Sequence, residues 1–414
     1  MGWRGRSRAV GAGEARGRRR LLLGAFGDPG HAFPMIALGG ALAARGHAVT
    51  MQTWSQWREP VERAGMRFAS APEYQVFPTR ERPLKPYQAA VRATRETRPL
   101  IQELQPDAVV ADILTTAVAL AAEVEGVPWA TLVPHVFPPG ADGFPPYSLG
   151  ARLPRTGLGR RLWRRLERPV GSGLRRGRDE LNGARDRLGL PALAHLHGGI
   201  SEKLCLVGTF PQLEYPRAWP SGTHVVGPLF WEPPTPDVEL PPGTDPLVLV
   251  APSTSQDPEH RLLRAAVAGL AKLPVRVLAT CNRQPLPKPI RVPENARVVD
   301  WLSYARTMPE CAVVVCHGGH GTMVRALASR CAVVVAPVSG DMNENAARAD
   351  WAGVGLRVPW RFVSPSTLRM AVRRALDEPG LHARARELAA WADAKSGATR
   401  AADAVEEFAH RKRG

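Results

Sequence analysis

The segment Ala312-Val-Val-Val-Cys-His-Gly-Gly-His-Gly-Thr322 joins a short apolar run to a glycine-rich loop and the start of an amphipathic stretch. The apolar run predicts a buried parallel strand over 312–316, and the residues after the loop predict a helix over 322–330. Glycines let the backbone approach a ligand closely, and free N–H groups at a helix N-terminus favour phosphate oxygens. This strand–loop–helix unit therefore predicts a diphosphate site, although a tight turn without a ligand would carry the same letters.

Apolar runs and amphipathic stretches alternate on both sides of this segment. They predict strands at 247–251, 275–280, 296–299 and 332–336, and helices at 259–272, 343–351, 365–377 and 380–409. A second loop, 337–345, follows the strand at 332–336. Because ligands bind outside the carboxyl ends of parallel strands, the two loops predict one shared pocket.

The first half of the chain shows the same alternation. A strand at 20–26, a helix at 31–45 and a strand at 47–53 predict one βαβ unit, and 107–133 predicts another strand–helix–strand unit. The sequence thus predicts an α/β protein with two Rossmann-like doubly wound domains in series. The predicted divisions are 1–18 (disordered basic tail), 19–227 (N-terminal domain), 228–246 (Pro-rich linker), 247–390 (C-terminal domain) and 391–414 (a C-terminal helix, with packing back on the N-terminal domain as one option).

The net charge of +17 comes mainly from two Arg-rich segments. Residues 1–20 carry seven Arg and one Glu, and residues 151–187 carry twelve Arg and four acids. Aromatic residues do not alternate with these runs as base stacking would require, so we interpret the runs as solvated surface and expect no nucleic-acid partner. No stretch reaches the roughly 18 apolar residues of a membrane span, which predicts no integral membrane segment.

The cysteines predict no disulfide framework and no zinc site. Their number is odd, their spacing is scattered, and no pair has the C-x-x-C form. We expect buried free thiols in a reducing compartment, and hence a cytoplasmic protein. The five residues are Cys205, Cys281, Cys311, Cys316 and Cys331.

Several motifs taken together resemble the family 1 glycosyltransferases that modify natural products and antibiotics. The matching segments are Asp300-Trp-Leu302, the loop at 317–322, Gly340-Asp341, Asn345-Ala-Ala-Arg348, and the stretches 30–50 and 248–255. The resemblance implies the GT-B fold, in which two Rossmann-like doubly wound domains face a central cleft. The N-terminal domain would bind the acceptor, and the C-terminal domain would bind a UDP- or dTDP-linked sugar. It implies inverting transfer to a hydroxyl of a small lipophilic natural product, with no metal or cofactor. The implied partners are the small-molecule acceptor and the nucleotide sugar, and the protein itself would be a monomer or a homodimer.

The resemblance also implies roles for single residues. His31 would be the base that deprotonates the acceptor, and Asp112 would orient its ring. Trp301 would hold the nucleobase, an N–H of His317 would donate to the diphosphate, and Asp341 would bind sugar hydroxyls. The implied donor-binding residues are Ser253, Thr254, Ser255, Trp301, Leu302, His317, Gly319, His320, Gly321, Thr322, Asp341 and Met342.

Simpler interpretations stay open for these residues. His31 could be a residue at a helix N-terminus with no catalytic role. Asp112 could be a simple N-cap of the helix that follows it. Asp28 is a rival base just before the matching motif. The acceptor pocket is expected in the less patterned regions 54–90 and 137–200, with Phe33, His135 and Phe137 as candidate lining residues.

Two residues depart from the family pattern. Arg325 stands where many members carry a Glu that accepts hydrogen bonds from the ribose, and a guanidinium has only donors. Met342 stands where many members carry a Gln that binds sugar hydroxyls. Both departures favour a deoxysugar donor or an impaired donor site. The alternative function is therefore a nucleotide-binding homologue without activity, or an auxiliary partner of another transferase; a sugar-nucleotide epimerase is a third possibility.

Overall fold

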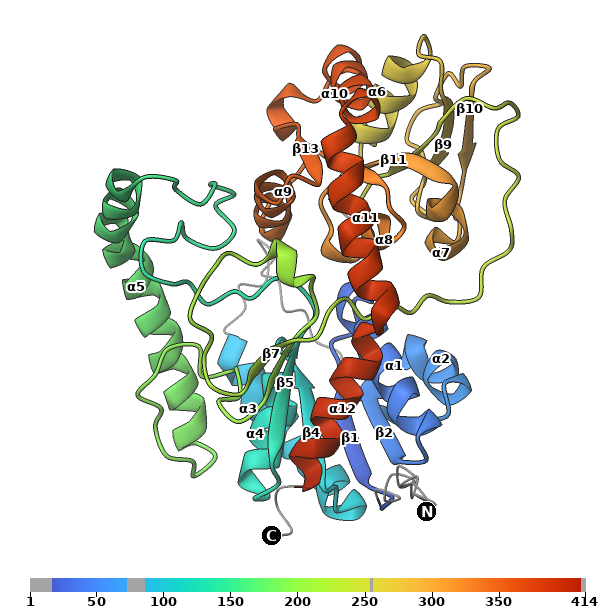
Figure 1. Cartoon of the computed structure of the whole chain (residues 1–414). Helices are drawn as coiled ribbons and strands as arrows, with labels where there is room; N and C mark the ends of the chain where they lie inside the picture. The colour runs from blue at the N-terminus through green and yellow to red at the C-terminus, as the bar shows by residue number, and fades with distance from the viewer. Residues whose placement is uncertain (1–16, 73–85, 254–255, 411–414) are drawn as a thin grey trace, which may run out of the picture.

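The computed structural model describes residues 17–72, 86–253 and 256–410, so most of the predicted tail at 1–18 lies outside the described residues. The chain forms two α/β domains, each built on one parallel sheet (Figure 1). The prediction of two doubly wound domains is confirmed. All five cysteines are buried and free.

The N-terminal sheet has the strand order β3-β2-β1-β4-β5-β6-β7. Leu21 and Leu23 of β1 point to one face of the sheet and Leu22 to the other, and all three are buried, as a parallel sheet requires. Helices α1 and α12 cover the first face, and α3 and α4 cover the second. The bounds are β1 Arg20–Gly24, α1 Pro29–Ala44, β2 Ala48–Thr53, α2 Arg58–Arg63, β3 Arg67–Ser70, α3 Pro86–Leu104, β4 Ala108–Asp112, α4 Thr116–Val124, β5 Trp129–Val133, α5 Gly157–Asp186, β6 Cys205–Val207 and β7 Thr223–Val225.

The C-terminal sheet has the strand order β10-β9-β8-β11-β12-β13. Helices α8 and α11 pack on one face, and α6 and α10 pack on the other. Strand order reverses between β8 and β11 here, and between β1 and β4 in the other domain, which is where such sheets bind ligands. The bounds are β8 Leu247–Ala251, α6 Arg261–Leu270, β9 Arg276–Thr280, β10 Ala296–Val299, α7 Tyr304–Thr307, β11 Cys311–Cys316, α8 His320–Ala328, β12 Ala332–Val335, α9 Asp341–Trp351, β13 Gly355–Arg357, α10 Pro365–Asp377, α11 Pro379–Ala394 and α12 Gly397–His410.

The chain ends in two helices where one was predicted over 380–409. Helix α11 stops at Ala394 and α12 starts at Gly397, with Lys395 in an extended conformation between them. A Cβ atom on Gly397 would lie 2.2 Å from the carbonyl oxygen of Pro228, so only glycine allows this contact with the start of the linker. The break therefore follows from a tertiary contact that local helical periodicity does not reveal.

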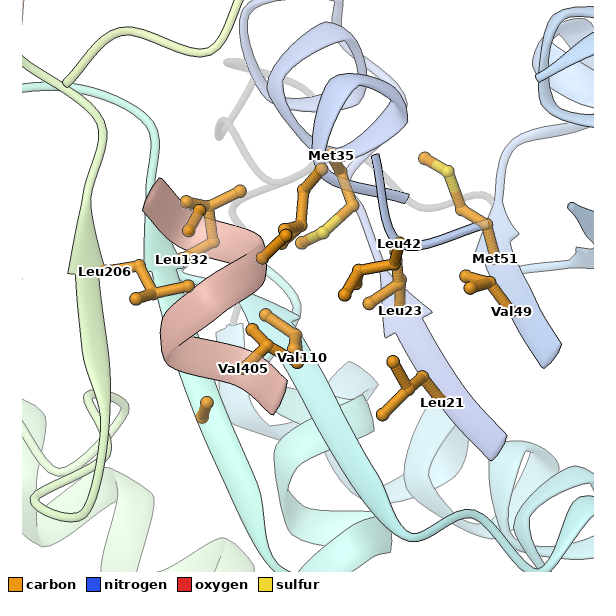
Figure 2. Packing of buried hydrophobic residues seen from close by; sticks show 14 of the residues in the cluster. Leu21, Leu23, Met35, Leu42, Val49, Met51, Val110, Leu132, Leu206 and Val405 are labelled. Atoms are coloured by element: carbon orange, nitrogen blue, oxygen red, sulfur yellow. The ribbon is translucent and has the colours of Figure 1, made fainter. Parts of the chain in front are cut away.

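Helix α12 lies on the N-terminal sheet, although the preceding helix α11 belongs to the C-terminal domain. Val405 packs into the same core as Leu132 and Leu206 (Figure 2). Buried polar contacts add to this apolar packing, since Glu406 accepts a hydrogen bond from His47 at 2.8 Å. The chain thus connects the two domains twice, through residues 228–246 and through the turn before α12.

The poorly patterned region 137–195 contains one long helix. Helix α5 has 30 residues, and Leu181 near its C-terminal end is buried against the N-terminal domain. Across the part of the chain that the structure describes, we find no helix with the length and apolar character needed to traverse a bilayer.

Candidate active site

A histidine–carboxylate pair lies at the point where strand order reverses in the N-terminal sheet. His31 is the third residue of α1, which follows β1, and Asp112 ends the neighbouring strand β4. His31 Nδ1 lies 2.8 Å from Asp112 Oδ2, and Asp112 Oδ1 accepts a hydrogen bond from the backbone N–H of Leu114 at 2.8 Å. Because a carboxylate can only accept, Nδ1 carries the proton and Nε2 keeps its lone pair.

The pKa of His31 is raised above its ordinary value. Burial is the largest influence and lowers the pKa, but the charge and hydrogen bond of Asp112 outweigh it, with help from Asp28 and Asp341. The His31 side chain is 17% exposed and that of Asp112 is fully buried. Asp112 is therefore fixed in the interior, while the partly exposed ring of His31 can contact a ligand.

His135 lies beside this pair, just after β5. Its ring centre is 6.2 Å from that of His31, in an edge-to-face arrangement. Nδ1 donates to the carbonyl of Val136 at 2.8 Å, and the hydroxyl of Tyr147 lies 3.4 Å from the same nitrogen. Burial and the nearby His31 lower the pKa of His135. His135 is therefore a neutral ring next to the candidate base.

The glycine-rich loop between β11 and α8 forms the other half of the site. Gly318 has a φ of +92°, a conformation that favours glycine. Its carbonyl accepts a hydrogen bond from the Asn345 side chain at 2.9 Å. Helix α8 begins at His320 with Gly319 as N-cap, and no side chain caps it. Its first N–H groups consequently have no partner within the helix, which suits an anion.

His317 lies over this helix start in an orientation that sequence did not predict. Nδ1 lies 3.3 Å from the carbonyl oxygen of Ala251, which can only accept, so Nδ1 carries the proton of the neutral ring. A Cβ on Gly319 would lie 2.4 Å from Nε2, so this nitrogen sits at the N-cap of α8. Burial lowers the pKa of His317. The neutral ring therefore has no N–H for a phosphate; it donates from Nε2 only after taking up a proton.

His320 was expected at the donor site, but its side chain is buried in the domain interface. Nε2 lies 3.3 Å from the carbonyl of Gly208 in the N-terminal domain, and Nδ1 lies 3.4 Å from the Asn345 side chain. Burial lowers the pKa of His320 to about 3. The side chain thus joins the domains, and His320 can contribute to an anion site only through its backbone N–H at the start of α8.

The remaining donor-site candidates are spread around the same edge. Trp301 and Leu302 follow β10, and Trp301 stacks under the Arg283 guanidinium at 4.6 Å while its Nε1 donates to Thr235 at 3.3 Å. Leu302 is buried. Ser253 is buried after β8, Gly321 is exposed and Thr322 is half-buried on α8, and Met342 lies against Gly318. Thr254 and Ser255 lie outside the described residues.

Arg325 makes its contacts with the linker. Its guanidinium lies 4.3 Å from the centre of the Phe230 ring. Burial lowers its pKa, and the nearby Glu232 partly opposes that effect. Arg325, which departs from the family pattern, therefore stacks its guanidinium on an aromatic ring of the linker.

Asp341 shows that the two halves face each other. It is the first residue of α9 in the C-terminal domain, yet its charge raises the pKa of His31 and opposes the lowering at His135. A buried ion cluster fixes this arrangement, since Arg348 of α9 donates to Glu344 and to Glu214 of the N-terminal domain, both at 2.8 Å.

One of the three candidate acceptor residues, Phe137, is placed differently from expectation, while Phe33 is half-buried in an aromatic cluster. Phe33 packs edge-to-face on Trp57 at 5.2 Å and on Trp231 of the linker at 5.0 Å. Phe137 is 2% exposed and packs on Trp219, so it supports the wall from behind rather than lining a pocket. Of the three, only His135 lies beside His31. The correction for Phe137 arises from its tertiary contact with Trp219.

Sequence reasoning missed Tyr147 and Glu214. Tyr147 reaches His135, and Glu214 both pairs with Arg348 and accepts a hydrogen bond from the backbone N–H of Phe137. Both residues lie in irregular segments without a motif. The Asn345-Ala-Ala-Arg348 motif was the available signal, because a cation at a buried helical position requires a carboxylate partner.

Comparison with known proteins identifies the family of this chain. The family "Erythromycin biosynthesis protein CIII-like, C-terminal domain" matches residues 264–408. The chain is 30% identical over 428 residues to 4'-demethylrebeccamycin synthase of Lentzea aerocolonigenes, covering 94% of this chain and 99% of the relative. It is also 30% identical over 435 residues to O-mycaminosyltylonolide 6-deoxyallosyltransferase of Streptomyces fradiae, covering 94% and 97%.

Solved structures show the same architecture. The glycotransferase of kitacinnamycin has a TM-score of 0.75 at 23% identity, over 94% of this chain and 99% of that one. Glycosyltransferase VinC, solved in complex with dTDP, has a TM-score of 0.67 at 22% identity, over 95% and 100%. Fold and site together define the GT-B class of glycosyltransferases. The chain belongs to family 1 of these enzymes, the antibiotic-modifying type, and is itself a glycosyltransferase.

Proposed function

We propose that this glycosyltransferase moves a sugar from a nucleoside diphosphate to a hydroxyl of a small lipophilic natural product, with inversion and without a metal ion. The observation that carries the proposal is the 2.8 Å contact between His31 Nδ1 and Asp112 Oδ2. This contact leaves Nε2 of a partly exposed ring as a proton acceptor.

The reaction then needs one proton transfer and one displacement. The acceptor hydroxyl gives its proton to His31 Nε2, and Asp112 stabilises the resulting imidazolium. The acceptor oxygen forms a bond to the anomeric carbon while the bond from that carbon to the diphosphate breaks on the opposite face. The electron pair leaves with the diphosphate, so the product has the inverted configuration.

The leaving diphosphate requires stabilisation of its negative charge. The free N–H groups at the start of α8 supply this in our proposal, together with His317 once it is protonated. Asp341 would bind hydroxyls of the sugar, since it lies on the C-terminal side and acts on His31 across the site.

The nucleotide is proposed to be dTDP rather than UDP. Arg325 has no acceptor for a ribose 2′-hydroxyl, and its guanidinium is directed to Phe230. A deoxyribose loses nothing at this position. The VinC structure, solved with dTDP, is in keeping with this preference but concerns that protein.

Replacing the base tests the proposal. His31→Ala should lower kcat by about 10²- to 10⁴-fold on a panel of hydroxylated aromatic and macrolide aglycones, while dTDP binding by calorimetry stays unchanged. The exposed His224→Ala is the matched control and should keep full turnover. Product anomers would be assigned by NMR, and EDTA should leave the rate unchanged. A His31→Ala variant that turns over as fast as wild type would exclude this mechanism. Wild-type protein that binds the nucleotide but transfers no sugar would favour a non-catalytic homologue.

A further inference from the structure

The first half of helix α5 stands apart from the body of the protein. In Figure 1 the N-terminal end of α5 lies at the outer edge of the molecule, away from both sheets. Its C-terminal half is anchored, since Arg185 donates to both oxygens of Glu123 at 2.6 and 2.7 Å. The exposed N-terminal half of α5 therefore extends from a C-terminal half that is fixed to the N-terminal domain.

This exposed half carries a stripe of apolar side chains. Leu158 is 78% exposed, Leu162 56%, Leu166 43% and Val170 38%, so four of the nine most exposed large apolar side chains among the described residues lie on this one helix. The four residues are spaced by four, so they follow one face of the helix. We call them the apolar stripe. Such a contiguous exposed patch on a soluble surface marks an interaction site.

Arginines surround the apolar stripe. Residues 157–178 carry eight Arg and a single acid, Glu167. Arg160, Arg161 and Arg165 are exposed and form no ion pair with any carboxylate of the described residues, and Arg164 has only a 3.7 Å contact with Asp142. The local positive charge is therefore available to an outside partner.

We propose that the apolar stripe and its arginines dock the protein on an anionic lipid surface. A helix with a leucine face and an arginine-rich remainder is suited to lie in the headgroup region of a bilayer, with its apolar side chains among the acyl chains. Each guanidinium can pair with a lipid phosphate in a bidentate manner. The surface requires neither a membrane span nor the proposed catalytic pair.

Charge argues against the other partners that this face might take. Two copies of the helix would bring two strongly positive segments together, and like charges repel in such a contact. A nucleic acid would use the arginines but would leave the apolar stripe exposed to water. A bilayer with anionic headgroups matches both features at once.

The position of α5 would bring a docked bilayer close to the acceptor side of the site, an argument that rests on the proposed function. The first turn of α5 touches the loop at 134–156, because a Cβ on Gly143 would lie 3.0 Å from Cβ of Arg160. The same loop carries His135, whose ring lies 6.2 Å from that of His31. A lipophilic acceptor dissolved in the bilayer would thus meet the protein next to its acceptor side.

Vesicle sedimentation of the full chain tests the docking without any turnover. We expect binding to phosphatidylcholine vesicles that contain one third phosphatidylglycerol, little binding to phosphatidylcholine alone, and release at high salt. The triple variant Leu158→Ser/Leu162→Ser/Leu166→Ser keeps every arginine and should bind at least about tenfold more weakly. These side chains are exposed, so the thermal midpoint should not change.

Two control variants separate this surface from other causes of binding. Phe362→Ser/Met370→Ser removes exposed apolar side chains of the C-terminal domain, which are 53% and 63% exposed, and should bind like wild type. A variant with the tail arginines at 4, 6 and 8 changed to Gln should also bind like wild type.

Four results would overturn the proposal: no wild-type binding, equal binding to neutral vesicles, full binding by the triple Leu variant, or loss of binding in the tail variant. A dimer that dissociates in the triple Leu variant, without vesicle binding, would assign the apolar stripe to a second copy.

Discussion

The pair of His31 and Asp112 sets opposite demands on one imidazole. Asp112 must hold the ring and stabilise its charge, yet the ring must be neutral before the reaction begins. The raised pKa of His31 means that the active neutral form becomes scarce as the pH falls. The residue-level chemistry therefore predicts a specific pH dependence.

Activity should be lost as the pH falls through the pKa of His31, with an acid limb of kcat/KM above pH 6.5, the ordinary value for histidine. In Asp112→Asn the main influences that raise this pKa are gone and burial remains, so the acid limb should move to lower pH. The maximal rate should fall by about 10²- to 10⁴-fold, because the ring loses its fixed orientation. A pH–rate profile measures both changes. An acid limb that stays in place in Asp112→Asn would exclude His31 as the titrating base.

His317 leads to a second prediction at the residue scale. Its Nδ1–H already donates a hydrogen bond to the carbonyl oxygen of Ala251. If Nε2 is to donate to a diphosphate, the ring must gain a proton on binding. The affinity for dTDP should then fall by up to about tenfold per pH unit as the pH rises between the lowered free pKa and the higher bound pKa.

Calorimetry in phosphate and Tris buffers measures this proton uptake directly. His317→Gln offers an N–H that does not titrate, so it should keep binding but lose the buffer dependence. The nucleotide's own phosphate titrates equally in both proteins and is removed by the comparison. Equal proton uptake in wild type and His317→Gln would show that His317 stays neutral.

At the scale of elements, helix α9 links the sugar side of the site to the N-terminal domain. Arg348 is 2% exposed, and the side chains of Glu214 and Glu344 are each 3% exposed. Burial raises the pKa of Glu344, while Arg348 opposes this effect. Removing the cation would leave two buried carboxylates without their partner.

Arg348→Met should therefore destabilise the protein by about 3–5 kcal/mol in urea unfolding. The loss should shrink at low pH, because burial raises the pKa of Glu344 and its carboxylate takes up a proton there. Arg330→Met is the matched control, because its pair with Asp393 is 61% and 60% exposed and should contribute less than about 1 kcal/mol. Similar losses in both variants would mean that the buried cluster is not what joins α9 to the N-terminal domain.

The same scale shows what sequence can predict. Strand β11, the glycine-rich loop and the start of α8 were predictable because the local sequence determines all three. The valines favour a buried strand, Gly318 allows the positive φ of the loop, and no side chain caps the start of the helix. Strands of three residues such as β6 and β13 escaped prediction because they are shorter than any reliable period. The break between α11 and α12 depends on the contact of Gly397 with Pro228.

The candidate site shows the same division. His31 and Asp112 were predictable because each ends or follows a strand and matches a motif, and the structure brings them together. The placements of His320 and Phe137 depend on residues distant in sequence, namely Gly208 and Trp219. Residue type alone did not distinguish a ligand-facing side chain from one in a domain interface.

At the scale of the whole molecule, the chain crosses between the domains twice and joins them. Helix α11 packs on the C-terminal domain, and α12 completes the core of the N-terminal sheet. Val405 is fully buried there in one cluster with Leu132 and Leu206 (Figure 2). Since α12 shares with α1 the cover of one face of the N-terminal sheet, the N-terminal core includes residues from the end of the chain, and we expect one cooperative thermal transition.

Val405→Asp should separate this single transition into two. A carboxylate buried without a partner destabilises by several kcal/mol, so α12 should leave the sheet and the N-terminal domain should melt first. Differential scanning calorimetry counts the transitions, and added dTDP should raise only the later one, because the proposed nucleotide loops lie in the C-terminal domain. Ala394→Asp, at the exposed end of α11, is the control and should keep one transition. A single transition in Val405→Asp that shifts as a whole would mean that the buried contacts of Arg348 and His320 join the domains even without α12.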